Sequence, residues 1–273
     1  MFLLVWLGSA LAGFLGAITG LGGGVVIVPL LALGLHVDLR YAIGASLLSV
    51  IATSSGAAAA YVREGLTNIR IGMFLEVATT LGALAGAAVA VHVATGFVAT
   101  VFGVVLLGAA AVSLRRPGDA TTPGPLTGMA RTFRLHGTLV QDGVAVAYNA
   151  QRTPGGFGLM FVAGMLSGLL GIGSGALKVI AMDNVMRLPF KVSTTTSNFM
   201  IGVTAAASAG VYLSRGYVVP GLAAPVVLGV LPGALAGARL LPRMHSRVLR
   251  LVFTGVIVIL AVEMLLKGLT GSL

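Results

Sequence analysis

The sequence contains no cysteine, which excludes disulfides, iron–sulfur clusters and thiolate metal sites. Charge is also scarce, because 9% of the 273 residues are charged where soluble domains carry roughly 25%. The four histidines (His36, His92, His136 and His245) are scattered at or near expected loops, so neither a metal site nor a cofactor is expected. The first Lys or Arg is Arg40, so the amino-terminal segment lacks the basic region of a cleaved signal peptide.

Apolar residues and glycine make up most of the chain. Hydrophobic residues account for 57% of it, and there are 40 glycines. Glycine lets membrane helices approach closely where no hydrophobic force drives them together. The net charge of +10 falls in short gaps between apolar runs, which indicates membrane topology rather than nucleic-acid binding. The composition therefore predicts a polytopic membrane protein.

Eight apolar stretches are visible, and two of them do not resemble single straight helices. They cover residues 2–34, 41–62, 70–91, 97–114, 157–186, 192–214, 218–239 and 248–266. A spanning helix needs about 20 apolar residues. The first and fifth stretches are interrupted by glycine clusters at 20–24 (Gly-Leu-Gly-Gly-Gly) and 171–175 (Gly-Ile-Gly-Ser-Gly). Since glycine disfavours a helix interior, we expect each stretch to break there.

The two glycine clusters belong to an internal duplication with an offset of 151 residues. The same offset relates Ser46 to Ser197, Thr53 to Thr204, Tyr61 to Tyr212, Gly65 to Gly216, and the identical Gly-Ala-Leu-Ala-Gly-Ala motifs at 82–87 and 233–238. Internal repeats of this kind are typical of transporter folds.

The distribution of basic residues favours inverted repeats. If each broken stretch crosses the membrane once, the repeats are parallel and Lys and Arg divide almost evenly between the two sides. If each broken stretch instead enters and leaves on one side, the repeats are inverted and thirteen basic residues share one side. These are Arg63, Arg70, Arg115, Arg116, Arg131, Arg134, Arg152, Arg187, Lys191, Arg239, Arg243, Arg247 and Arg250, against Arg40, Arg215 and Lys267. By the positive-inside rule, both termini are then outside.

The predicted fold class is an all-α polytopic membrane protein with two inverted repeats of about four helical segments each. Residues 1–115 form the first membrane repeat, 116–156 a cytoplasmic connecting loop, and 157–273 the second repeat. Within the loop, Asp142-Gly143 separates two partly alternating apolar runs, a pattern that favours a small β-hairpin.

The glycine breaks are the first candidates for a binding site. Candidate substrate-binding residues here are Gly22, Gly23 and Gly24 in the first repeat and Gly173, Ser174 and Gly175 in the second. A break at membrane depth is tolerated where the freed backbone faces protein or a watery cavity, and a half-helix starting there directs its positive end at an anion. The alternative is close helix packing by glycine, and both can hold. No Lys-Ser/Thr follows the first cluster, which argues against a phosphate-binding loop.

Hydroxyl and amide side chains near the breaks are further candidates. They are Ser46 and Thr53 in the first repeat and Thr196, Ser197 and Asn198 in the second. Neutral donors suit an anion that must bind and leave. The alternative for each hydroxyl is a bond to its own helix or to a neighbouring one.

Lys178 lies three residues after Gly175 in an apolar run. A buried cation in a membrane is a functional candidate, and its expected partner is Asp183 or the substrate. The alternative is a lysine that reaches the interface. Glu76 and Glu263 are the acids within predicted spans, and Glu76 is the better candidate for proton coupling.

These motifs resemble the sulfite exporter TauE/SafE family of anion permeases. The resemblance rests on the glycine-rich segments at 16–24 and 168–175, on Gly65 and Gly216, and on the paired Gly-Ala-Leu-Ala-Gly-Ala motifs. It implies a secondary transporter in the inner (plasma) membrane for sulfite, organosulfonates or related sulfur-containing or carboxylate anions. One departure is Ile180 in place of Pro29, which predicts a differently shaped second broken helix.

Two other functional classes compete with a transporter. A membrane enzyme acting on a lipid-linked substrate would need a cluster of catalytic His, Asp or Glu, which the sequence lacks. A membrane assembly factor would need neither broken helices nor a buried lysine. The expected partners are the anion and the lipid bilayer, with a homodimer left open and no nucleic acid.

Overall fold

The structure, a computed structural model, is a helical bundle with one small sheet. It describes residues 2–35, 37–89, 124–126, 128–141, 144–170 and 174–270, together with residues 94, 96, 97, 100, 103, 104, 107, 108, 110 and 111. The predicted stretch 97–114 therefore falls largely outside the described residues, as do Asp142 and Gly143. The fold class is that of an all-α membrane protein, as the sequence predicts.

The helices form two sets with matching bounds. The first set is α1 (Phe2–Thr19), α2 (Gly24–Pro29), the π-helix η1 (Leu30–Gly34), α3 (Leu39–Arg63) and α4 (Ile69–Val89). The second is α7 (Thr153–Leu170), α8 (Gly175–Ile180), the π-helix η2 (Ala181–Val185), α9 (Phe190–Ser214) and α10 (Pro220–Leu240), followed by the 3-10 helix η3 (Leu241–Arg243) and α11 (Ser246–Thr270). Each element from α1 to α4 begins and ends 151 residues before its counterpart. From the sequence we expect Ile180 to give the second broken segment a different shape. This expectation is wrong, because the helices of the two broken segments begin and end at equivalent positions.

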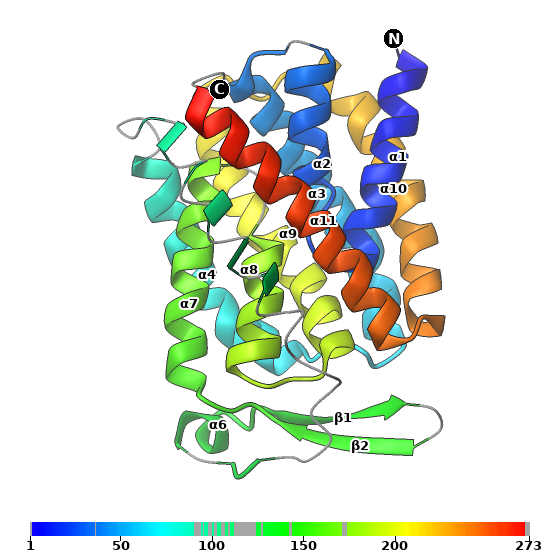
Figure 1. Ribbon diagram of the computed structural model, residues 1–273, viewed down its shortest axis with the longest axis vertical. Coiled ribbons are helices and arrows are strands. Elements are labelled where there is room, and N and C mark those ends of the chain that lie inside the picture. Colours follow the sequence, from blue (N-terminus) through cyan, green and yellow to red (C-terminus); the bar gives the residue numbers. More distant parts are fainter. Residues whose placement is uncertain are drawn as a thin grey trace.

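Equivalent helices of the two sets run in opposite directions. The Thr195 hydroxyl, near the start of α9, donates to the carbonyl oxygen of Leu66, just past the end of α3. At the other end, the backbone of Gly44 in α3 packs against the carbonyl oxygen of Tyr217, just past the end of α9. Both chain termini lie at one end of the bundle and the hairpin lies at the other (Figure 1). The repeats are therefore inverted.

The first segment of each repeat turns back before it has crossed the bundle. In the first repeat, α1 ends at Thr19 and α2 starts at Gly24. Gly20 and Gly22 between them have φ values of +75° and +78°, a backbone conformation that L residues with side chains adopt rarely. These two glycines reverse the chain, so that α2 returns toward the end at which α1 begins (Figure 1).

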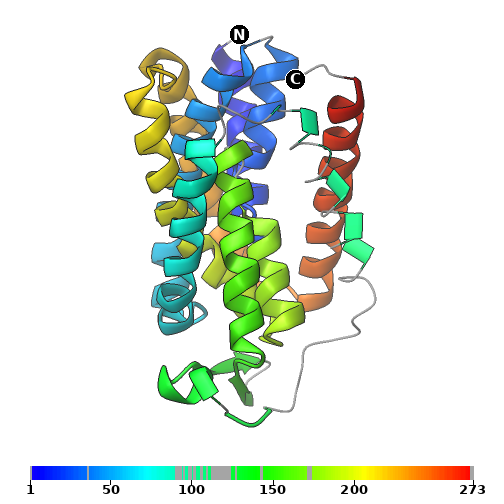
Figure 2. The ribbon, with the colours of Figure 1, turned by 90° about the vertical axis from the view of Figure 1, so that its left-hand side faces the viewer.

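Glycines hold the two repeats together. A Cβ atom at Gly13 would lie 2.2 Å from the carbonyl oxygen of Val230, and one at Gly233 would lie 1.9 Å from that of Ala10, so α1 packs directly on α10. The symmetry-related pair is α7 on α4, where Gly164 lies as close to Thr79; Figure 2 shows these helices side by side. Each broken segment thus packs against a helix of the other repeat.

The hairpin caps one end of the bundle. Strands β1 (His136–Gln141) and β2 (Val144–Asn149) pair antiparallel, with His136 opposite Asn149 and Gln141 opposite Val144. The short helix α6 (Gly128–Thr132) precedes them. The Asn68 amide, between α3 and α4, donates to the Tyr148 hydroxyl at 3.0 Å and to the His136 carbonyl oxygen at 3.1 Å. Burial raises the pKa of Tyr148, so the phenol stays a neutral hydrogen-bonding group at this contact.

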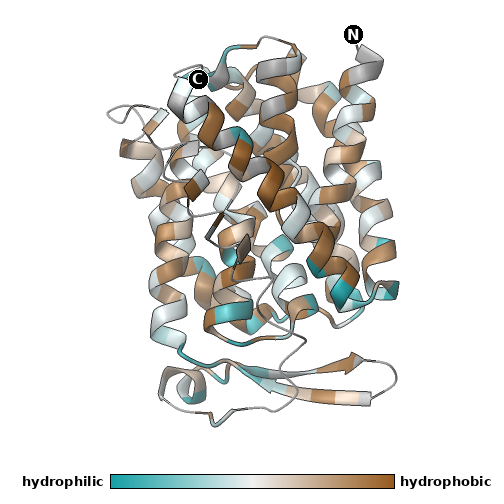
Figure 3. Cartoon of the chain, viewed as in Figure 1, coloured by the Kyte–Doolittle hydropathy of each residue, from teal (hydrophilic) through white to brown (hydrophobic). Residues whose placement is uncertain are grey.

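The outer surface suits lipid. Met73, Val77 and Leu81 follow one another along α4 and are each more than half exposed, and apolar residues cover the outward side of α11 (Figure 3). Within the described part of the chain, three helices are long and apolar enough to cross a bilayer: Arg40–Arg63, Ile69–Val89 and Pro220–Arg243. These features identify an integral membrane protein.

Candidate functional site

The two broken segments meet inside the bundle. A Cβ atom at Gly175, the first residue of α8, would lie 2.3 Å from the carbonyl oxygen of Gly20 and 2.5 Å from the Cα of Leu21. The backbone of the second break therefore touches that of the first, and only glycine allows this approach. Close packing and a shared site are thus compatible uses of these glycines. Residues 171–173 lie outside the described residues, and with them the candidate Gly173.

Polar side chains of α9 bind both breaks. The Ser197 hydroxyl lies within hydrogen-bonding distance of the carbonyl oxygens of Gly20 (2.8 Å) and Gly175 (3.3 Å). The Asn198 amide donates to the carbonyl oxygen of Ala17 at 2.6 Å. Ser46 makes the equivalent contact in the first repeat, donating to the Gly24 carbonyl oxygen at 3.2 Å. All three side chains are fully buried.

Of the other candidate residues, some contact the glycine breaks and one does not. Gly23 packs against the Thr53 hydroxyl, which bonds the Ser49 carbonyl oxygen of its own helix. Gly22 packs against Ile201 of α9. Thr196 is turned toward another region, since its hydroxyl accepts the backbone N–H of Asn68 at the hairpin end. The structure therefore does not bring Thr196 to the breaks.

Four polar atoms at the start of α9 and just before α8 lack a partner among the described residues. The hydroxyls of Ser174, Ser193 and Thr194 and the Oδ1 atom of Asn198 are buried and make no hydrogen bond to any described residue. Thr194 packs against Gly20, and Ser174 directly precedes Gly175. Buried polar groups are nearly always bonded to protein or to water, so this cluster has unused capacity for a polar ligand.

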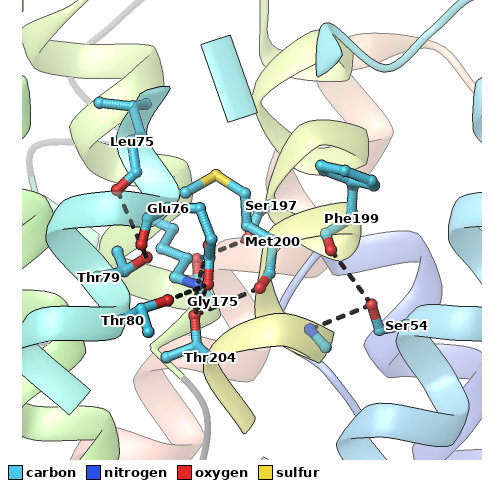
Figure 4. A network of polar contacts seen from close by, with 12 residues as sticks. Ser54, Leu75, Glu76, Thr79, Thr80, Gly175, Ser197, Phe199, Met200 and Thr204 are labelled. Carbon is cyan, nitrogen blue, oxygen red and sulfur yellow. Dashed lines mark hydrogen bonds and ion pairs between the residues drawn. The ribbon is translucent and has the colours of Figure 1, made fainter. Parts of the chain in front are cut away.

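Lys178 is fully buried and binds Glu76, not Asp183. Its Nζ atom lies 3.5 Å from Glu76 Oε2 and donates to the Thr204 hydroxyl at 2.5 Å. The Thr204 hydroxyl donates to Glu76 Oε1 at 2.6 Å, and Thr80 donates to the same oxygen at 3.1 Å (Figure 4). With an exposure of 0%, Lys178 does not reach an interface.

The expected pairing of Lys178 with Asp183 is therefore wrong. Asp183 lies one turn further along, in η2, where its carboxylate accepts two bonds from Arg250 of α11 at 2.7 and 3.2 Å. Arg250 also stacks over the Phe190 ring, 4.6 Å from its centroid. Asp183 therefore faces α11, whereas Lys178 faces α4 and α9. Asp183 anchors the half-helix that carries the lysine.

Thr204 and Thr80 are partners of the charged pair that the sequence did not indicate. Thr204 was visible only as the repeat counterpart of Thr53, and Thr80 lies one turn after Glu76. The sequence does contain a hint of the Lys178–Glu76 pair itself. The two residues carry opposite charges in separate apolar segments, and a charge buried in a membrane requires a partner.

The charged cluster has no counterpart at the positions related by the repeat. The positions related to Lys178, Glu76 and Thr204 by the 151 offset are Ile27, Val227 and Thr53. Ile27 is fully buried in an apolar cluster that also contains Val226 and Val230. The geometry therefore points to one charged half-site, at the second repeat, rather than to two equal ones.

No metal centre is visible in the described part of the chain, where no three His, Asp or Glu residues are grouped to hold an ion. His36 and His92 lie outside the described residues. Glu263, the second candidate acid, lies on α11 and is not part of the Lys178 cluster.

We expect Ser197→Ala to loosen the junction of the breaks. The change removes contacts to two buried carbonyl oxygens, and an unpaired buried group costs about 1–3 kcal/mol. For a chain of this size that corresponds to a drop of roughly 2–12 °C in the melting temperature, measured on purified protein in detergent. Ser208→Ala is the matched control, since Ser208 is buried on the same helix but bonds only Thr204 O of that helix. Equal melting of the two variants would show that Ser197 does not join the repeats.

Inverted repeats with a re-entrant first segment and a buried charged residue beside the break are typical of transporter folds. Comparison with known proteins agrees. The model of the sulfite exporter TauE/SafE family matches residues 5–264, and the chain belongs to this family.

Two relatives from Bacillus subtilis (strain 168) are similar along nearly their whole length. Probable membrane transporter protein YunE is 29% identical over 276 residues, covering 98% of each chain. Probable membrane transporter protein YdhB is 26% identical over 255 residues, covering 92% of this chain and 93% of the relative. No solved structure matches significantly. Family and relatives indicate a membrane transporter rather than an enzyme.

Proposed function

We propose that the protein is a secondary transporter for small anions, namely sulfite, organosulfonates or related sulfur-containing or carboxylate anions. The observation that carries the proposal is the fully buried Lys178 beside the junction of the two breaks. A buried cation attracts an anion strongly in a low-dielectric site. The description of the family as sulfite exporters supports the same substrate class.

The site has three parts in this proposal. Lys178 supplies the positive charge beside Thr204. The unpartnered groups of Ser174, Thr194 and Asn198 supply polar contacts further along the path of the anion, since Thr194 and Thr204 are about 15 Å apart on α9, and the glycine backbones set the width of that path. Small neutral donors bind an anion without holding it permanently, which suits a carrier. The remaining candidates Gly22, Gly23, Gly24, Ser46 and Thr53 line the related half-site of the first repeat, where the charge is absent.

Alternating access follows from the inverted repeats. The repeats at 1–115 and 157–273, which residues 116–156 connect, would together supply two units that move against each other about the junction. Because α1 packs on α10 and α7 on α4 across the repeats, each re-entrant segment would move with a helix of the other repeat.

Transport by purified protein in liposomes tests the proposal. Sulfite, methanesulfonate, acetate and chloride are offered separately across a concentration gradient, with protein-free liposomes as the control. We expect uptake of at least one of the first three above the control and above chloride. Uptake of none of them would contradict the proposed function.

We further propose that the termini lie outside the inner membrane and that the hairpin is cytoplasmic. The absence of native cysteine makes single-cysteine labelling direct. Val140→Cys lies on the hairpin, where Val140 is 70% exposed, and Ser214→Cys lies at the opposite end of the bundle. An impermeant maleimide added to intact cells should label the second variant and spare the first. The reverse pattern would contradict the orientation.

A further inference from the structure

The charged pair raises the question of how an anion would reach Lys178. The ammonium group is already held by Glu76 Oε2 at 3.5 Å and by the Thr204 hydroxyl at 2.5 Å. Thr204 in turn donates to Glu76 Oε1 at 2.6 Å. The carboxylate thus occupies the place that an anionic ligand of Lys178 would take.

Among the described residues, Glu76 is the acid that contacts Lys178. Helix α7, which packs on α4, has no titratable residue. On α9, Lys191 bonds the Pro242 carbonyl oxygen, and Tyr212 lies near the opposite end of the helix from it. On the half-helix itself, Asp183 is bound by Arg250, and on α4 Arg70 is exposed at the first turn. Lys178 and Glu76 therefore balance each other's charge in a buried site.

We propose that Glu76 and the transported anion compete for Lys178, and that Glu76 takes up one proton whenever the anion binds. This inference rests on the proposed function. In the empty site the pair is ammonium and carboxylate, with no net charge. When a monovalent anion binds the ammonium, the displaced carboxylate would leave one uncompensated negative charge, and burying such a charge costs several kcal/mol.

A proton on Glu76 removes that cost. The loaded site then contains an ammonium, an anion and a neutral carboxylic acid, and its net charge is again zero. One proton accompanies each monovalent anion, and no net charge crosses the membrane. Thr204 and Thr80 remain as hydrogen-bond partners for the protonated acid, because a hydroxyl both donates and accepts.

The difference between the two half-sites explains why only one group would exchange a proton in each transport cycle. The related positions hold Ile27 in the first repeat and Val227 in the second, and neither side chain binds an anion or exchanges a proton. One charged half-site takes up one monovalent anion and one proton per cycle, whereas two equal half-sites would take up two of each.

Proton movement in liposomes tests the coupling. The probe is methanesulfonate, which stays ionised near neutral pH, so accompanying protons must be carried by the protein. An inward gradient of it is applied to liposomes that contain a pH-sensitive dye. For wild-type protein we expect the interior to acidify as the anion enters. The apparent affinity should also fall with rising pH, by up to about tenfold per pH unit, as binding of one proton requires.

Glu76→Gln separates coupling from transport. The glutamine amide has nearly the shape of the glutamate carboxylate but cannot bind or release a proton. In this variant the charge of Lys178 is no longer balanced by Glu76, so a bound anion must balance it. We expect anion-driven acidification to fall to the level of protein-free liposomes, while exchange of labelled for unlabelled anion continues. Glu64→Gln makes the same chemical change at the exposed end of α3 and should behave as wild type.

Three results would overturn the proposal. Wild-type anion entry without acidification would remove the coupling and leave the anion transporter in place. Acidification that persists in Glu76→Gln would assign the proton to another group. Absence of methanesulfonate entry in the wild type would contradict sulfonate transport itself, and the coupling would fall with it.

Discussion

Lys178→Ala is expected to reduce anion uptake in liposomes to the level of protein-free controls. The lysine is the buried cation at the junction of the breaks, and an alanine leaves the anion without a counter-charge. Lys178→Arg should restore a small part of the activity, because the guanidinium keeps the charge but is larger and planar. Initial uptake at equal protein content is the measurement.

The alanine variant also loses stability, which the experiment must separate from transport. Removing one partner of a buried ion pair typically costs about 3–5 kcal/mol, since the other charge remains unpaired. The double variant Lys178→Met/Glu76→Gln removes both charges and keeps similar volumes. It should melt close to wild type and still fail to transport. Transport by the double variant at wild-type rates would show that the ion pair only stabilises the fold.

Gly164→Ala is expected to destabilise the whole bundle. A Cβ atom there would lie 2.0 Å from the carbonyl oxygen of Thr79 in α4, so α7 must move away from α4. Overpacking usually costs about 1–3 kcal/mol, and here the obstacle is backbone, which cannot rotate aside. We expect the upper part of that range or more, with a fall of roughly 6–12 °C in the melting temperature and lower yield in the membrane.

Gly158→Ala is the matched control for that change. Gly158 is on the same helix, and no atom lies within 4 Å of a Cβ placed there. Alanine is favoured over glycine inside a helix by about 0.5–1 kcal/mol, so this variant should melt at or slightly above the wild-type temperature. Similar losses in both variants would mean that the close approach of α7 to α4 is not needed.

The overall plan of the fold could be predicted from the sequence. The 151-residue offset of the polar pairs predicted the matched helices, and the glycine clusters predicted breaks between α1 and α2 and between α7 and α8. The surplus of Arg and Lys in alternate gaps predicted the inverted arrangement. These signals are local or periodic, and a single chain displays them directly.

The contacts between repeats could not be predicted in the same way. The glycine pattern does not indicate whether α1 packs on α10 or on α4. A stripe of small residues shows that a helix has a close-packed face, but not which helix packs against it. The same limit explains the error at Lys178. Asp183 is near in sequence, but Glu76, 102 residues away, is brought to the lysine by the packing of α4 against the second repeat.

Thr196 shows the same limit on a smaller scale. It belongs to a run of hydroxyl residues whose members face different sides of α9, since successive helical residues are rotated by about 100°. Ser197 and Asn198 turn to the breaks, whereas Thr196 turns to Asn68. Which members of the run reach the junction depends on how α9 is rotated in the bundle.

The most direct test of the central claim is to locate a bound anion. Selenite is a close chemical analogue of sulfite, and its selenium gives an anomalous signal in crystals of the protein. The account predicts one strong peak within about 4 Å of Lys178 Nζ, a distance at which unit charges still attract strongly, with Glu76 displaced from the lysine. A peak elsewhere in the molecule, with the Lys178–Glu76 pair intact, would contradict it.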